Sequence, residues 1–127
     1  MDSGAIRRVL ALGLTVLTAS GLIALASPGR AEAADFCSGH KVRTLSFSTG
    51  SVGIYKSNGY VCAVTTAAKV GRTAMSVSVQ ARGSLPVADA GQYTHYAGPV
   101  VVHAGHRCVW VRGSVGSASV SSGWILC

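Results

Sequence analysis

Carboxylate side chains, which many acid–base enzymes need in pairs, are scarce in this sequence. It contains four, and only Asp35 and Asp89 lie beyond residue 33. A glycosidase needs two carboxyl groups placed around one glycosidic bond. A serine triad needs a carboxylate that orients a histidine, and Asp89 with His95 or His103 is the formal candidate. No serine lies in a nucleophile-elbow motif, so we expect no catalytic residue of either class.

The four histidines suggest two other kinds of chemistry. His103 and His106 are three residues apart with His95 nearby, and together with Cys108 they resemble a metal-binding set. Residues three apart on a hairpin face opposite sides, and Cys108 is better used in a disulfide. We therefore expect exposed histidines, with no metal and no cofactor. His40, together with a second histidine and a lysine, has the groups that acid–base cleavage of RNA requires.

The beginning of the chain has the pattern of an export signal. A pair of arginines precedes an apolar stretch over residues 9–26, and the small side chains of Ala31 and Ala33 follow. This order is typical of a secretory signal peptide. We expect a helical signal peptide over residues 1–33, cleaved after Ala33, and one secreted domain over residues 34–127 with no transmembrane anchor. The alternative is an uncleaved anchor, because the apolar stretch reaches the lower limit for spanning a bilayer.

All of the cysteines lie in the expected secreted domain. An even number in an oxidising compartment predicts two disulfides, with three connectivities that the sequence does not separate. We expect pairing in chain order, in which each bridge closes a loop of about 20 to 26 residues and contributes about 3 kcal/mol in the chain-entropy model. No C-x-x-C spacing supports a zinc site. The expected bridges are Cys37–Cys62 and Cys108–Cys127.

Basic side chains dominate the same domain. Eight Lys and Arg residues stand against two carboxylates, a net charge of about +6 that attracts anionic partners such as wall teichoic acids, nucleic acid or acidic lipids. The cations are spread singly, which favours a solvating surface, and there is no specific nucleic-acid motif. Three aromatic residues lie near two of the arginines and suggest a stacking or sugar-binding face, although strand packing also explains such residues. This candidate binding face comprises Tyr93, Tyr96, Trp110, Arg107 and Arg112.

Short β-strands are the elements that must position these residues. Residues 73–81 alternate apolar and polar side chains, the period of a half-buried strand. Residues 51–57 and 60–66 are rich in β-branched and aromatic side chains. They flank Asn58-Gly59, the pair that a type I′ turn prefers because both positions need positive φ. This part of the sequence predicts a β-hairpin.

Further strands are expected on both sides of this hairpin. Residues 42–48 predict an earlier strand, and residues 124–127 a closing strand held by the last cysteine. Residues 100–103 and 107–112 resemble a second hairpin, turning through Ala104-Gly105-His106. Six or seven short antiparallel strands with Gly-rich turns predict an all-β fold, a small disulfide-linked β-sandwich or barrel.

Three segments are expected to be irregular. Residues 83–91 carry a proline, an aspartate and two glycines, and predict an exposed, mobile loop. Residues 113–123 are rich in Gly and Ser and suggest a flexible tether, although Val115 and Val120 would allow a strand. Residues 67–69 suggest one short helical turn.

Two segments together resemble one known family. Residues 91–100, GQYTHYAGPV, followed by GHRCVW at residues 105–110, are similar to the spore-associated proteins of streptomycetes. Residues 58–64, NGYVCAV, resemble a strand of that family, and the resemblance extends back to Cys37 near the start of the expected secreted domain. The resemblance implies a small secreted protein of aerial hyphae or spores, with no established enzymatic activity and no active-site residue to carry over.

Three functions are therefore expected, in order of preference. The first is a secreted, non-enzymatic structural or binding protein of an actinomycete spore or cell surface, with anionic or glycan components of the cell wall or spore coat as partners. The second is an extracellular effector, either an enzyme inhibitor or an antimicrobial factor, acting through the exposed loop at residues 83–91. The third is a small basic ribonuclease.

Overall fold

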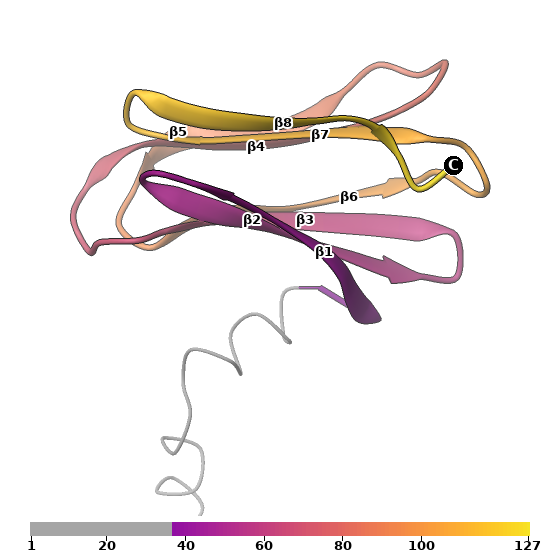
Figure 1. Ribbon diagram of the computed structural model, residues 1–127, viewed down its shortest axis with the longest axis horizontal. Coiled ribbons are helices and arrows are strands. Elements are labelled where there is room, and N and C mark those ends of the chain that lie inside the picture. Colours follow the sequence, from indigo (N-terminus) through magenta and orange to yellow (C-terminus); the bar gives the residue numbers. More distant parts are fainter. Residues whose placement is uncertain (1–36) are drawn as a thin grey trace, which may run out of the picture. The chain divides into compact units, whose positions relative to one another are not determined.

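Two four-stranded antiparallel sheets make up residues 37–127, which are the residues described by a computed structural model (Figure 1). The eight strands are β1 (His40–Phe47), β2 (Gly50–Ser57), β3 (Tyr60–Ala67), β4 (Thr73–Ala81), β5 (Val87–Tyr93), β6 (Tyr96–His103), β7 (Val109–Val115) and β8 (Ala118–Ile125). One sheet has the order β1-β2-β3-β6 and the other β5-β4-β7-β8, and the sheets form two facing layers. The expected all-β, disulfide-linked fold is confirmed as a sandwich, with one strand more than the largest number expected. The expected signal peptide, residues 1–33, lies outside the described residues.

Alternating side chains of the central strands build the core between the layers. On β4, Met75, Val77 and Val79 are at most 2% exposed, whereas the serines between them lie on the outer face. The facing layer contributes Val52 and Ile54 of β2, which are also fully buried. Each buried side chain of this size stabilises the fold by about 1.5–3 kcal/mol relative to exposure. The strand predicted for residues 73–81 is confirmed.

The hairpin expected around Asn58-Gly59 is also present. Asn58 has φ 51° and Gly59 φ 83°, so both central positions are left-handed as a type I′ turn requires. The Gly59 carbonyl accepts hydrogen bonds from the amides of Ala104 at 2.9 Å and Gly105 at 3.0 Å. These bonds attach the turn to the connection between β6 and β7.

The segment expected as an exposed, mobile loop, residues 83–91, is exposed over most of its length, but only residues 83–86 lie outside a strand. The second half of the segment forms β5, which pairs with β4 from Val79↔Val87 to Thr73↔Tyr93. The carboxylate of Asp89 fixes this edge strand, because it accepts hydrogen bonds from the Tyr93 hydroxyl at 2.7 Å and the Gly98 amide at 2.8 Å. Pairing with β4 and the bonds of Asp89 thus override the turn propensity of the segment.

The connection through Ala104, Gly105 and His106 does not close a hairpin. A turn is present, since the Arg107 amide donates to the Ala104 carbonyl at 3.0 Å. However, β6 pairs with β3 in one sheet and β7 pairs with β4 and β8 in the other, so the chain crosses between layers here. The apolar side chains of β6 and those of β7 both face the interior, each set from its own sheet. The chain crosses between the layers, and both sets are buried in the same core.

The Gly- and Ser-rich stretch over residues 113–123 is mostly strand and not a tether. β7 continues to Val115, Gly116 turns with φ 64°, and β8 pairs back along β7. The strand expected at residues 124–127 is correct only at its start, because β8 ends at Ile125. The short helical turn expected at residues 67–69 is absent, since β3 extends to Ala67.

Both expected disulfides are present and pair in chain order. Cys37–Cys62 lies on the outer face of the β1-β2-β3-β6 sheet, packed with Val64. Cys108–Cys127 joins the start of β7 to the last residue. No cysteine between residues 37 and 127 is free, as is consistent with an extracellular protein. Within the same residues there is no helix that could cross a membrane.

Candidate functional site

The five residues of the expected binding face lie in three separate places. Trp110 and Arg112 project outward together from β7. Tyr93 is held by Asp89 at the end of β5, whereas Tyr96 packs beside the Cys37–Cys62 disulfide on the other sheet. Arg107 lies in the connection between the sheets. The structure therefore brings together only the Trp110 and Arg112 pair.

Arg107 is engaged in holding two connections to each other. Its guanidinium donates to the carbonyls of Ala104 at 3.1 Å, His103 at 2.8 Å and Arg82 at 3.3 Å, and to the Ser84 hydroxyl at 3.1 Å. These bonds use most of the N–H donors of the Arg107 guanidinium group. Arg107 is thus a structural residue of the β4–β5 and β6–β7 connections.

Two further residues complete the site around Trp110 and Arg112. The indole of Trp124 contacts that of Trp110 edge to face, with centroids 5.3 Å apart and planes at 87°. The Arg112 guanidinium lies 5.3 Å from the Trp110 ring centre, and the Arg82 guanidinium lies 5.3 Å from the Trp124 ring centre. We call these four residues, Arg82, Trp124, Trp110 and Arg112, the Trp–Arg cluster.

Strand register explains why these residues meet. Trp110 stands opposite both Gln80 of β4 and Trp124 of β8, and all three positions point away from the core. A shift of register follows between Trp110 and Arg112, where the Ser122 hydroxyl accepts a hydrogen bond from the Val111 amide at 2.8 Å. This bulge places the second indole beside the first.

The tryptophans are fixed but reachable from solvent. The Trp110 indole N–H donates to the Ser121 hydroxyl at 2.6 Å, which sets the orientation of the ring. Trp124 is 38% exposed although it is apolar. Arginines stacked on indole faces keep their planar donors free for a carboxylate or phosphate. The cluster can therefore bind an anionic group against an apolar ring.

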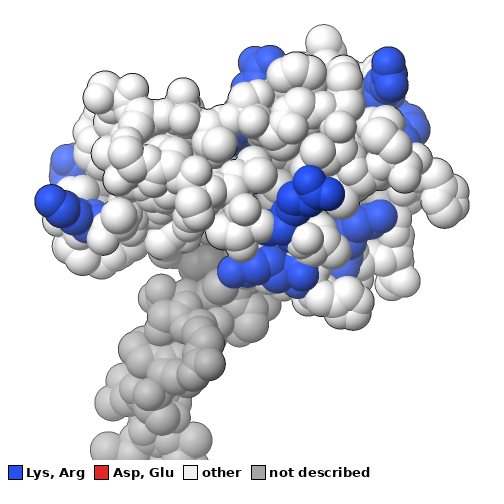
Figure 2. Space-filling model, in the orientation of Figure 1, with Lys and Arg blue, Asp and Glu red and all other residues white. Residues whose placement is uncertain are grey.

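Carboxylate side chains are scarce in the part of the chain that carries the cluster. Asp89 is the only carboxylate side chain in residues 37–127, and both of its oxygens are bonded to Tyr93 and Gly98. Figure 2 shows basic side chains at several separate places on the visible face and no acidic one. An external anion therefore meets no competing carboxylate side chain at Arg82 or Arg112.

His40 and His103, one pair that could serve acid–base cleavage of RNA, lie on opposite edges of one sheet. His40 begins β1 and His103 ends β6, the two edge strands of one sheet, with β2 and β3 between them. Three strand spacings separate their backbones by about 14 Å. The His103 and Tyr60 rings are in edge-to-face contact, with their centres 4.7 Å apart. Within residues 37–127 no three metal-ligating side chains form a group.

Sequence reasoning missed Trp124 and Arg82 as members of the site. The contact of Trp124 with Trp110 depends on the register of β8 at the bulge in the β7–β8 pairing. The contact of Arg82 with Trp124 depends on the position of the β4–β5 connection. Of the cluster, only Trp110 and Arg112 were among the residues expected at a binding face. They lie two residues apart on one strand, so their side chains share a face of the sheet.

No family model, curated protein or solved structure matches this chain.

Proposed function

We propose that this chain is a secreted, non-enzymatic protein of an actinomycete cell or spore surface, and that it binds anionic glycan polymers of the wall or spore coat. The observation that carries the proposal is the Trp–Arg cluster, two ordered indoles each contacted by an arginine on an exposed sheet face. Indole faces pack against the apolar side of a sugar ring. Guanidinium groups recognise phosphate or carboxylate with paired hydrogen bonds.

The surface surrounding the cluster suits a hydroxylated polymer. Serines take several outward positions of β4, β7 and β8, and two of them, Ser76 and Ser114, hydrogen-bond across β4 and β7 at 2.6 Å. Serine hydroxyls next to exposed indoles offer weak polar contacts to an extended chain. The proposed ligand is therefore a polymer that runs along the sheet.

Three observations support the proposed location. The sequence of residues 1–33 has the order of an export signal. Two disulfides indicate an oxidising compartment. The segments at residues 91–100 and 105–110 resemble the spore-associated proteins of streptomycetes.

Co-sedimentation with purified actinomycete cell walls tests the proposal. We expect the protein to pellet with the walls and to be released by concentrated salt, because exposed ion pairs are screened. The double variant Arg82→Gln/Arg112→Gln should stay in the supernatant. The control Lys56→Gln/Arg72→Gln loses the same charge outside the cluster and should still pellet. Equal binding of both double variants would reject the cluster as the site.

One observation favours the effector function as a second candidate. Leu85 is 86% exposed in the connection between β4 and β5. The adjacent Ser84 is held by its amide to Ala81, by its carbonyl to Gln80 and by its hydroxyl to Arg107. An apolar side chain presented on an ordered loop suits a pocket of another protein. Inhibition of a secreted protease that Leu85→Asp abolishes would support this function, and no inhibition by the parent would remove it.

A further inference from the structure

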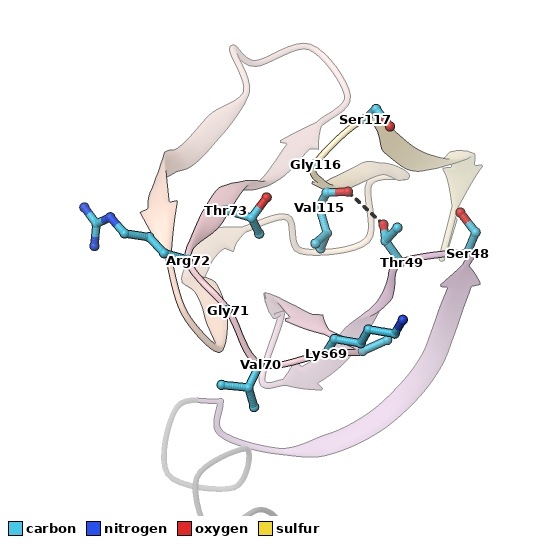
Figure 3. Close-up of a pocket in the computed structure, with 11 residues that line it drawn as sticks. Ser48, Thr49, Lys69, Val70, Gly71, Arg72, Thr73, Val115, Gly116 and Ser117 are labelled. Atoms are coloured by element: carbon cyan, nitrogen blue, oxygen red, sulfur yellow. Dashed lines mark hydrogen bonds between the residues drawn. The ribbon is translucent and has the colours of Figure 1, made fainter.

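A hollow opens at one end of the sandwich, on residues that the Trp–Arg cluster does not use (Figure 3). Its volume is about 460 Å³, within the range of small-molecule sites. The walls come from the β1–β2 turn, the β3–β4 connection and the β7–β8 turn. We call it the end hollow and define it by Ser48, Thr49, Lys69, Thr73, Gly116 and Ser117.

Hydrogen bonds between its walls hold the end hollow open. The Ala68 amide donates to the Thr49 carbonyl at 2.9 Å, and the Thr49 hydroxyl donates to the Val115 carbonyl at 2.7 Å. The Gly116 amide donates to the Ala74 carbonyl at 2.8 Å. All three connections are thereby tied to neighbouring strands, so the space is formed before any ligand arrives.

The polar part of the lining consists of basic and hydroxyl side chains, beside apolar residues such as Val70 and Val115. In Figure 3 the Lys69 side chain points towards the side that carries Ser48 and Thr49, whereas Arg72 and Val70 point away. No carboxylate side chain lines the hollow. Lys69 is an exposed residue of the lining, and its ammonium group attracts anions to the hollow.

Three side-chain hydroxyls besides that of Thr49 lie among the residues that line the hollow. Ser48 lies in the β1–β2 turn, Thr73 begins β4 and Ser117 lies in the β7–β8 turn, and each hydroxyl can donate or accept a hydrogen bond. At the turn between β7 and β8, Gly116 has no side chain, and a Cβ placed there would lie 3.6 Å from the Thr73 hydroxyl oxygen. Gly116 therefore lies beside the Thr73 hydroxyl on this wall of the hollow.

We infer that the end hollow binds a small anionic polyol, a phosphate or carboxylate carried on a short hydroxylated carbon chain. Lys69 contacts the anionic group, and the surrounding serine and threonine hydroxyls contact the hydroxyls of the ligand. A buried apolar residue, Val115, forms part of the wall and contacts the carbon chain. This inference stands whether or not the Trp–Arg cluster binds a polymer, because the two sites share no residue.

Titration with glycerol 3-phosphate, followed by NMR of the disulfide-intact protein, tests the inference. We expect saturable shifts of the backbone amides at residues 48–49, 68–73 and 115–117. The Lys69→Gln variant should bind about tenfold more weakly, the effect of losing one charge-assisted hydrogen bond. Lys56→Gln removes the same charge from β2, away from the hollow, and should bind within about twofold of the parent.

Two further ligands separate the possible sources of binding. Glycerol lacks the anion and should produce no saturable shift, whereas inorganic phosphate lacks the polyol and should bind more weakly than glycerol 3-phosphate. Equal weakening by Lys69→Gln and Lys56→Gln would overturn the inference, as would binding of glycerol as tightly as its phosphate. Shifts confined to residues 110–112 and 124 would assign the anion to the Trp–Arg cluster instead.

Discussion

Thr65 and Gly113 face each other across the interior of the sandwich. Thr65 lies on β3 of one sheet and is fully buried, and Gly113 lies on β7 of the other. A Cβ added to Gly113 would be 2.6 Å from the Thr65 hydroxyl oxygen and would overlap a methyl group of Val52. The two layers approach so closely here that this position of β7 has no room for a side chain.

Gly113→Ala is therefore expected to destabilise the protein by about 1–3 kcal/mol, the usual cost of overpacking a core. Urea unfolding followed by circular dichroism measures the change. Gly53→Ala is the matched control, because its nearest contact is the movable Tyr55 ring at 3.2 Å. Equal stability of the two variants would show that the layers are not in close contact at Gly113.

Thr65→Val should leave stability unchanged or raise it by about 1 kcal/mol. Among the described residues, the Thr65 hydroxyl has no hydrogen-bond partner although it is completely buried. Burial of an unpaired hydroxyl costs free energy, and valine has nearly the same shape without that cost. A loss of more than about 1 kcal/mol in the same urea experiment would mean that the hydroxyl makes a stabilising bond.

Tyr93 should ionise at higher pH than an ordinary tyrosine. The hydrogen bond to Asp89 raises the pKa of Tyr93, with contributions from burial and the charge of Asp89. The folded protein thus holds this proton more tightly than the unfolded chain. The resulting stability is full below the ordinary tyrosine pKa and is lost as the pH rises through the raised value. Asp89→Asn should lower the Tyr93 pKa, which an absorbance titration of tyrosinate detects as one tyrosine ionising earlier. Identical titration curves for parent and variant would contradict the assigned bond.

Arg107→Gln is expected to loosen the connection between β4 and β5. The variant loses the bonds to Arg82 and Ser84, with a cost of about 1 kcal/mol or more for charge-assisted bonds. Limited proteolysis should then cut near Leu85 sooner than in the parent. Arg72→Gln is the control and should be cut at the parental rate. Unchanged proteolysis of Arg107→Gln would show that the loop is ordered without this brace.

The sequence pattern predicted correctly those elements whose conformation depends on neighbouring residues alone. The alternation in β4 and the Asn58-Gly59 turn each depend on a few adjacent residues, and both are present as predicted. The strand β5 was missed because it forms by pairing with β4, from Val79↔Val87 to Thr73↔Tyr93, and its own composition is typical of a loop. The crossing at Gly105 was mistaken for a hairpin because a tight turn does not specify which sheet receives the next strand.

The candidate site was only half predictable for the same reason. Trp110 and Arg112 are two residues apart on one strand, so their common face follows from sequence spacing. Trp124 joins them only through the register of β8 after a bulge, and Arg82 only through the path of the chain beyond β4. Pairing register at a bulge is a property of the two paired strands, here β7 and β8, and not of either segment alone.

Intrinsic fluorescence gives the most direct test of the proposed function. The chain has two tryptophans, and both belong to the Trp–Arg cluster, so all indole emission comes from the proposed site. Titration with a purified poly(glycerol phosphate) wall polymer should change this emission in a saturable and salt-sensitive manner. Arg82→Gln/Arg112→Gln should weaken the response by about tenfold or more, whereas Lys56→Gln/Arg72→Gln should not. Unchanged emission at saturating polymer, or equal weakening in both double variants, would contradict polymer binding at the cluster.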